Sequence, residues 1–139
     1  QVDADLHAEL LFRSPLTAGV RSTHPRAKAR SLSALQGEEW IGWDAPMVHS
    51  LFSLHGLPLP RVLISHSYEV TQILVENTDL VGLFSLPLVE RKLVKHGIRP
   101  VRLREALPEL AVHAVMRRDA QLTPAAALFL DILRGIKKV

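Results

Sequence analysis

Several residue types and patterns are missing from this sequence, and each absence removes a class of protein. The 139 residues contain no cysteine, which excludes disulfide bonds and thiolate chemistry and fits a protein of the cytoplasm. No apolar run approaches the roughly 20 residues of a membrane-spanning helix, so we expect no membrane partner. The first ten residues, QVDADLHAEL, lack both a signal-peptide pattern and an initiator methionine, so we expect a fragment or a processed chain.

Patterns for binding phosphates or metals are missing as well. The seven glycines form neither G-x-G-x-x-G nor G-x-x-x-x-G-K, which are the loops that cradle phosphates. Five of the histidines lack metal-ligand spacing, and we expect them to be structural or exposed: His7, His49, His55, His96 and His113. We therefore expect no cofactor and no metal.

The positive charge is modest for a nucleic-acid-binding protein. The net charge is +3, and the cations are spread along the chain. The densest group contains Arg21, Arg26, Lys28 and Arg30. Because no aromatic residues alternate with these cations, we interpret the segment as a solvated loop rather than a phosphate-binding patch.

Segments with strand patterns alternate with segments that have helix patterns. The expected strands cover residues 8–12, 16–20, 39–43, 60–65, 80–86, 98–103 and 109–118, with Pro15 as a break between the first two and residues 60–65 as a buried strand. The expected helices cover residues 31–35, 47–55, 68–74, 87–96 and 124–136. Ser31, Ser67 and Thr123 are expected helix caps, and Gly56 and Gly97 are expected helix ends. This alternation predicts an α/β fold with a mostly parallel sheet and helices on its faces.

Three strand-to-helix junctions should meet at one edge of this sheet. They are IGWDAP at residues 41–46, ISHSYE at 64–69 and LFSLP at 83–87. Ligands of parallel α/β sheets bind at that edge, and helix N-termini there favour an anionic group. The candidate site residues are Trp43, Asp44, His66, Ser67, Tyr68, Phe84 and Ser85.

Structural roles remain open for the same residues. Ser67 and Asp44 are suited to cap helices, and Phe84 and Trp43 are suited to pack in a core. A catalytic interpretation would make Ser67 a nucleophile, His66 its base and Asp44 the residue that orients the base, as in a small α/β hydrolase. It is the weaker interpretation, because adjacent side chains rarely face each other and no G-x-S-x-G elbow is present.

The order of motifs resembles the LysR-type transcriptional regulators over nearly the whole chain. The segment ELLFRSPLTAGVRSTHPRAKARSLSALQGEEWI (residues 9–41) contains the His24-Pro25 turn, the Ser31-Leu32-x-x-Leu35 turn and the Trp40-Ile41 strand. Two further segments, residues 73–93 and 110–134, are similar to later parts of the same family. Asn77-Thr78-Asp79 departs from the family, where a small, glycine-containing turn is usual.

The resemblance implies an effector-sensing domain of the periplasmic-binding-protein type 2 fold, with two lobes and two crossing strands. Residues 1–21 would be a first-lobe remnant and the first crossing, residues 22–103 the second lobe, and residues 104–139 the second crossing and a first-lobe helix. A small organic effector, often an anion, would bind between the lobes, with Thr17 and Arg21 as further candidate contacts. The family also implies self-association as a dimer or tetramer, and DNA binding only through a winged helix-turn-helix that this chain lacks. An extracytoplasmic solute-binding protein of the same fold remains an alternative.

Overall fold

The chain forms two compact units. The computed structural model describes residues 4–119 and 121–135. The larger unit is Pro15–Pro108, and the smaller unit combines Gln1–Ser14 with Glu109–Val139. No helix in the described ranges combines the length and the apolar character that crossing a membrane requires.

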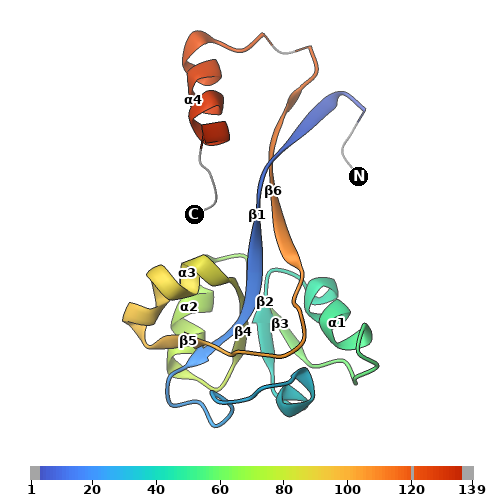
Figure 1. Ribbon diagram of the computed structural model, residues 1–139, viewed down its shortest axis with the longest axis vertical. Coiled ribbons are helices and arrows are strands. Elements are labelled where there is room, and N and C mark those ends of the chain that lie inside the picture. Colours follow the sequence, from blue (N-terminus) through green and yellow to red (C-terminus); the bar gives the residue numbers. More distant parts are fainter. Residues whose placement is uncertain (1–3, 120, 136–139) are drawn as a thin grey trace. The chain divides into compact units, whose positions relative to one another are not determined.

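A mixed sheet forms the centre of the larger unit (Figure 1). Its strands run in the order β3-β2-β4-β1-β5. β2 is parallel to both β3 and β4, whereas β1 is antiparallel to both β4 and β5. The parallel strands are therefore those that alternate with helices, as the sequence predicts, and β1 makes the sheet mixed because it runs against its two neighbours. The strand bounds are β1 Leu6–Arg21, β2 Trp40–Gly42, β3 Val62–Ile64, β4 Val81–Ser85 and β5 Ile98–Pro100.

Local capping sets the starts of the two longest helices in this unit. The Asp44 carboxylate accepts a hydrogen bond from the Met47 N–H at 2.8 Å before α1, and the Ser67 hydroxyl accepts one from the Val70 N–H at 3.3 Å before α2. Both capping predictions are confirmed. The helices are α1 Ala45–Ser53, α2 Tyr68–Asn77 and α3 Leu86–Arg91, with single 3₁₀ turns η1 Leu32–Leu35 and η2 Leu93–His96.

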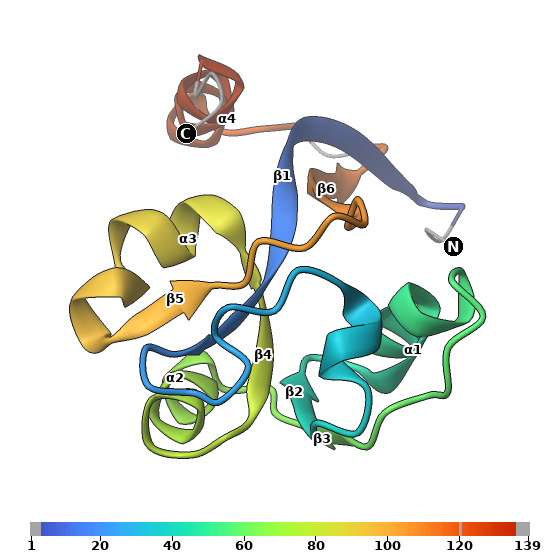
Figure 2. The ribbon, with the colours of Figure 1, turned by 60° about the horizontal axis from the view of Figure 1, so that its bottom comes forward.

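Helices cover both faces of the sheet and create two apolar clusters (Figures 1 and 2). α1 and η1 cover one face, where Trp40 and Phe52 are fully buried with their rings edge-on at 5.5 Å. α2, α3 and η2 cover the other face, where Ile41 and Phe84 are buried. The alternation of side chains along β2 explains why Trp40 and Ile41 belong to different clusters.

A glycine pair lets the Phe84 ring lie flat on the sheet. Gly19 of β1 lies opposite Gly82 of β4. A Cβ atom at Gly19 would lie 2.7 Å from the ring, and one at Gly82 would overlap it. Glycine is therefore required at both positions by the close approach of Phe84.

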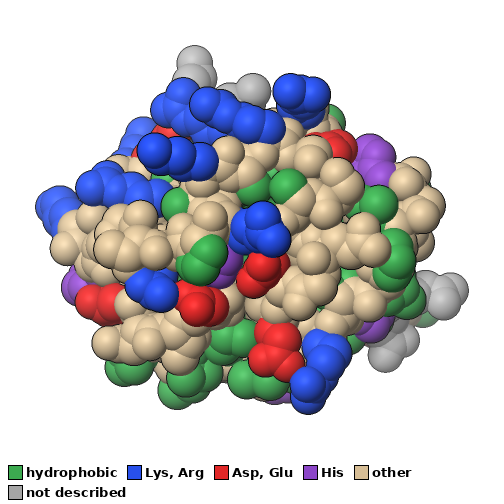
Figure 3. Space-filling view, turned by 90° about the horizontal axis from the view of Figure 1, so that it is seen from below, with side chains coloured by type: hydrophobic (Ala, Val, Ile, Leu, Met, Phe, Trp, Pro, Cys, Tyr) green, Lys and Arg blue, Asp and Glu red, His purple; other side chains and the backbone are tan. Residues whose placement is uncertain are grey.

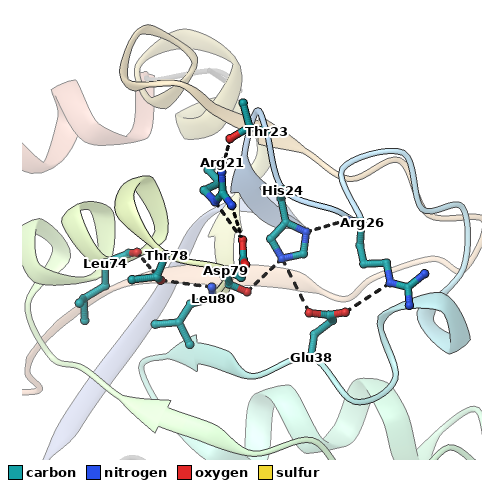
Figure 4. A network of polar contacts seen from close by, with 9 residues as sticks. All are labelled: Arg21, Thr23, His24, Arg26, Glu38, Leu74, Thr78, Asp79 and Leu80. Atoms are coloured by element: carbon teal, nitrogen blue, oxygen red, sulfur yellow. Dashed lines mark hydrogen bonds and ion pairs between the residues drawn. The ribbon is translucent and has the colours of Figure 1, made fainter.

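A polar network ties the turn after β1 to the start of β4 (Figure 4). The buried His24 accepts a hydrogen bond from the Arg26 N–H on Nδ1 at 2.9 Å, so its other nitrogen, Nε2, carries the proton and donates to the Asp79 carbonyl at 3.0 Å. Arg21 forms an ion pair with the Asp79 carboxylate at 2.7 Å and also contacts Thr23. The Thr-His-Pro turn is therefore a structural connection between two strands that lie far apart in the sequence.

Three strands differ from the sequence prediction. Pro15 does not interrupt the strand, and β1 continues through it. Pro15 lacks a backbone N–H, but it lies one residue before Leu16, where the pairing with β4 begins. The strand predicted as buried at residues 60–65 is β3, the terminal strand of the order, so Leu63 and Ile64 are about half exposed, at 46% and 49%. β5 ends at Pro100, and residues 101–103 pack without regular pairing.

The smaller unit contains a strand pair and one helix. β6, Glu109–Arg117, pairs with β1, and α4, Pro124–Gly135, begins after Thr123, whose hydroxyl accepts a hydrogen bond from the Ala126 N–H at 3.3 Å. Arg134 of α4 forms a two-pronged contact with the Glu9 carboxylate of β1, both distances being 2.7 Å. The last residue of the predicted helix, Ile136, lies outside the described residues. Three apolar side chains of α4 are exposed: Leu128, Phe129 and Ile132.

Candidate functional site

A pocket of about 140 Å³ lies where β2, β3 and β4 end in the larger unit. We call it the rim pocket. Four of the residues predicted from the three junctions line it, together with four that were not named. The lining residues are Gly42, Trp43, Ser65, Ser67, Tyr68, Thr71, Leu83 and Phe84.

The start of α2 forms the polar side of the rim pocket. The Ser67 hydroxyl donates a hydrogen bond to the Glu69 carboxylate at 3.2 Å while it accepts from the Val70 N–H. The Ser65 and Thr71 hydroxyls both donate to the Ser67 carbonyl, at 3.0 and 2.9 Å. These bonds fix the backbone around the helix cap. The N–H groups of the first turn of α2 point toward the N-terminus of the helix and have no carbonyl partners within it.

Tyr68 also lines the rim pocket, and its hydroxyl is buried in the surrounding protein. The hydroxyl oxygen is inaccessible to solvent and has no hydrogen-bond partner among the described residues. Burial raises the pKa of the Tyr68 hydroxyl above its usual range, and the Glu69 carboxylate raises it further. The Lys92 ammonium lies 5.3 Å from the centre of the Tyr68 ring, so a cation stands close to this wall of the pocket.

Aromatic side chains form the mouth and floor of the rim pocket. Trp43 is 65% exposed, and its ring lies 4.9 Å from that of His66 in a tilted arrangement. Phe84 is buried at the floor, against the glycine pair. An exposed indole beside a polar helix start offers an apolar surface for the body of a small organic molecule whose charged group faces the helix.

The remaining candidates lie around the pocket or away from it. Asp44 caps α1, and Ser85 precedes α3 without a side-chain capping bond. Thr17 lies opposite Phe84 across the β1–β4 ladder. Arg21 is four residues further along β1, about 13 Å in an extended strand, where it is paired with Asp79.

Serine, histidine and aspartate do not assemble a catalytic triad at this rim. The Ser67 hydroxyl contacts Val70 and Glu69, and His66 packs against Trp43. Among residues 4–119 and 121–135, no hydrogen bond joins His66 to Ser67 or to Asp44, and no group of three or more His, Asp or Glu side chains is arranged to hold a metal ion.

A larger pocket of about 440 Å³ lies elsewhere in the larger unit. It includes Thr17 and is lined mainly by aliphatic side chains, with Glu90, Glu105 and Arg102 among them. One carboxylate oxygen of Glu105 accepts a hydrogen bond from the Leu32 N–H at 3.1 Å, and the other is buried without a partner in the described part of the chain. Because this pocket is lined by two carboxylates and one guanidinium, it should bind an anion poorly. The smaller rim pocket is therefore the better candidate for an anion-binding site.

Ser65 and Thr71 are the polar lining residues that the sequence analysis did not name. Ser65 belongs to the ISHSYE junction, and Thr71 lies four residues after Ser67, one helical turn into α2. Helical spacing from the predicted cap would have found Thr71.

Comparisons with known proteins show the family and the fold of the chain. The family model described as "LysR substrate binding domain" matches residues 1–136. The chain belongs to this LysR family. The chain is also similar to the PA01 protein of Pseudomonas aeruginosa, assigned to the LysR regulators, with 27% identity and a TM-score of 0.76 over 96% of this chain and 49% of that protein. The chain therefore spans about half the length of this relative.

Two regulatory domains of LysR-type fold were solved with small molecules. The CcmR regulatory domain of Synechocystis PCC6803, in complex with 2-PG, has 20% identity and a TM-score of 0.76 over 99% of this chain and 71% of that domain. The effector-binding domain of QuiR, in complex with shikimate, has 16% identity and a TM-score of 0.76 over 97% of this chain and 68% of that domain. At these identities the likeness shows a shared fold.

Proposed function

We propose that this chain senses a small organic anion as the effector-binding part of a LysR-type transcription regulator. The observation that carries the proposal is the rim pocket, in which the ends of three strands bring Trp43, Ser67, Tyr68 and Phe84 around the start of α2. The ligands seen in the CcmR and QuiR domains support this class of guest.

The chemistry of the pocket supports an acidic ligand with a compact body. Helix N–H groups and the Ser67 hydroxyl could donate to a carboxylate or phosphate, and the buried Tyr68 hydroxyl could do so after its side chain turns toward the pocket. Binding would turn the Ser67 hydroxyl away from the Glu69 carboxylate. The Trp43 indole would cover the carbon skeleton.

The proposed role is sensing rather than catalysis. The side chains of the hydrolase alternative are already engaged in capping and stacking. The family match favours a regulator over an extracytoplasmic solute-binding protein. DNA binding by a helix-turn-helix segment of a longer protein and self-association as a dimer or tetramer belong to the same proposal. Exposed apolar side chains on β3 and α2 suit self-association: Leu63, Ile64, Val70 and Ile73.

A thermal-shift screen tests the effector site. The purified chain is heated with small aliphatic, aromatic and sugar acids, and a ligand that binds only the folded state raises the melting temperature. We expect Ser67→Ala to abolish the rise. Ser31→Ala, which removes another helix-capping hydroxyl, the one that accepts from the Ala34 N–H at 3.3 Å, is the matched control and should keep it. A rise that survives Ser67→Ala would contradict the assignment of the pocket.

A further inference from the structure

Two segments that are far apart in the sequence join to form one basic surface. The Arg104 N–H donates a hydrogen bond to the Arg30 carbonyl at 2.9 Å. Lys28, Arg30 and Arg102 line one pocket of about 320 Å³, together with Ala27, Ala29 and Pro100. We call Lys28, Arg30, Arg102 and Arg104 the basic ribbon. Lys and Arg side chains gather toward the upper left of the face shown in Figure 3.

The packing of these two segments directs their cations outward. Ala27 and Ala29 pack against the Trp40 cluster, and Lys28 and Arg30, which alternate with them, are exposed. In the second segment Val101 and Leu103 pack against the same cluster. Arg102 and Arg104 alternate with these two residues and are exposed. The arrangement places four cationic side chains on one outer surface.

The four cations of the basic ribbon have no acidic partner in the part of the chain that the structure describes. No ion pair involves any of them within the described residues, whereas Arg21, Arg26 and Arg61 of the same unit each pair with a carboxylate. Residues 22–37 and 91–104 contain no Asp or Glu, and the nearest carboxylate after the first segment, that of Glu38, pairs with Arg26. Nine of the seventeen Lys and Arg residues of the chain fall in these two segments.

We propose that the basic ribbon binds the phosphate backbone of duplex DNA. A pocket lined by alanine, proline and exposed flexible cations has no aromatic or buried polar group to orient a small ligand. Four cations spread over two neighbouring segments instead suit a polymer with regularly spaced charges, to which binding is driven by counterion release. The choice of DNA among polyanions rests on the proposed role in transcription regulation. The basic ribbon and the rim pocket share no residues. The proposed regulator would therefore have a DNA-binding surface in addition to its effector site.

Salt-dependent DNA binding tests the basic ribbon. Fluorescence anisotropy with a labelled 20-base-pair duplex of arbitrary sequence should show weak binding. A plot of the logarithm of the association constant against the logarithm of the salt concentration should have a slope of about −3 to −4, for four phosphate contacts. The double variant Lys28→Gln/Arg30→Gln should reduce the size of that slope by about 2. The matched control Arg13→Gln/Arg118→Gln removes the same charge from two cations of the smaller unit, which lie outside both segments of the basic ribbon, and should leave the slope unchanged.

Three results would overturn the DNA assignment. They are an absence of binding at 25 mM salt, an equal loss in the control variant, and competition by poly-glutamate as effective as that by unlabelled duplex, which would indicate an acidic protein partner. Far-ultraviolet circular dichroism confirms that each variant is folded. The Lys28→Gln/Arg30→Gln variant should also keep the thermal shift given by an organic acid, so failure of the DNA surface and failure of the effector site are separable.

Discussion

The larger and the smaller unit differ in how completely they bury their apolar side chains. The larger unit encloses two clusters around its sheet, in which many side chains are fully buried. In the described part of the smaller unit, Leu130 is the one apolar side chain that counts as buried, while α4 exposes its stripe. The comparison indicates that the larger unit has a core of its own, whereas α4 leaves its apolar stripe exposed.

A pair of phenylalanine substitutions tests this contrast most strongly. Phe52 is fully buried in the larger unit, and Phe129 is 61% exposed in the smaller unit. We expect Phe52→Ala to lower the free energy of unfolding by about 3–5 kcal/mol because it leaves a cavity. Phe129→Ala should change it by less than about 0.5 kcal/mol, as surface substitutions do. Urea denaturation measures both values. Similar losses for the two variants would show that α4 is buried in solution.

A pair of glycine substitutions gives the next largest effect. A methyl group at Gly82 would overlap the Phe84 ring, whereas one at Gly135 of α4 would meet nothing within 4 Å. We expect Gly82→Ala to destabilise the chain by about 1–3 kcal/mol through overpacking. It should also weaken effector binding, because Phe84 forms the floor of the rim pocket. Gly135→Ala should be neutral or slightly stabilising. A Gly82→Ala chain with unchanged stability would contradict the described position of the ring.

The contact between α4 and β1 should depend on pH. The hydrogen bond from Arg134 lowers the pKa of Glu9, against a smaller opposing effect of burial. Because the pKa is lower in the folded state, the stabilisation is present above the unfolded pKa and is lost as the pH falls through the folded pKa. We expect faster hydrogen exchange of α4 amides at acidic pH, after correction for intrinsic rates. Glu9→Gln should remove this pH dependence, and an unchanged dependence in that variant would assign it to another group.

The smallest expected effect concerns Tyr68. Its buried hydroxyl has no partner in the described part of the chain, so Tyr68→Phe should leave the melting temperature unchanged or slightly higher. The same substitution should weaken binding of an organic acid, because we expect the Tyr68 side chain to turn its unpartnered hydroxyl toward the bound acid. Calorimetric titration of Tyr68→Phe beside the unaltered chain measures this loss. Unchanged affinity would show that the ligand does not use this hydroxyl.

Local features of the fold were predictable from the sequence, and long-range ones were not. The caps at Asp44 and Ser67 depend on residues three positions away. The two strand-to-helix junctions that contain them were expected at the same edge of the sheet because parallel strands end at one edge. The exposure of Leu63 depends on β3 being the terminal strand. The pairing of Arg21 with Asp79 depends on how β1 meets β4, 58 residues later. Such contacts depend on the order of strands in the sheet, and the hydrophobic periodicity of the sequence does not predict that order.

The basic ribbon shows the same limit for function. In the sequence, Arg21, Arg26, Lys28 and Arg30 form a single cationic segment, which by itself indicates a solvated loop. The contact between Arg30 and Arg104 brings a second group of cations to the same surface. Only the tertiary structure joins the two groups.

Nuclear magnetic resonance of the ¹⁵N-labelled chain, titrated with an organic acid found in the thermal-shift screen, tests the effector site most directly. We expect saturable shifts that are largest at the amides of Trp43 and of residues 67–71, around the start of α2. Ser67→Ala should abolish these shifts. Saturable shifts centred instead on the larger pocket around Glu105 and Leu107, or on α4, would contradict the assignment of the effector site to the rim pocket.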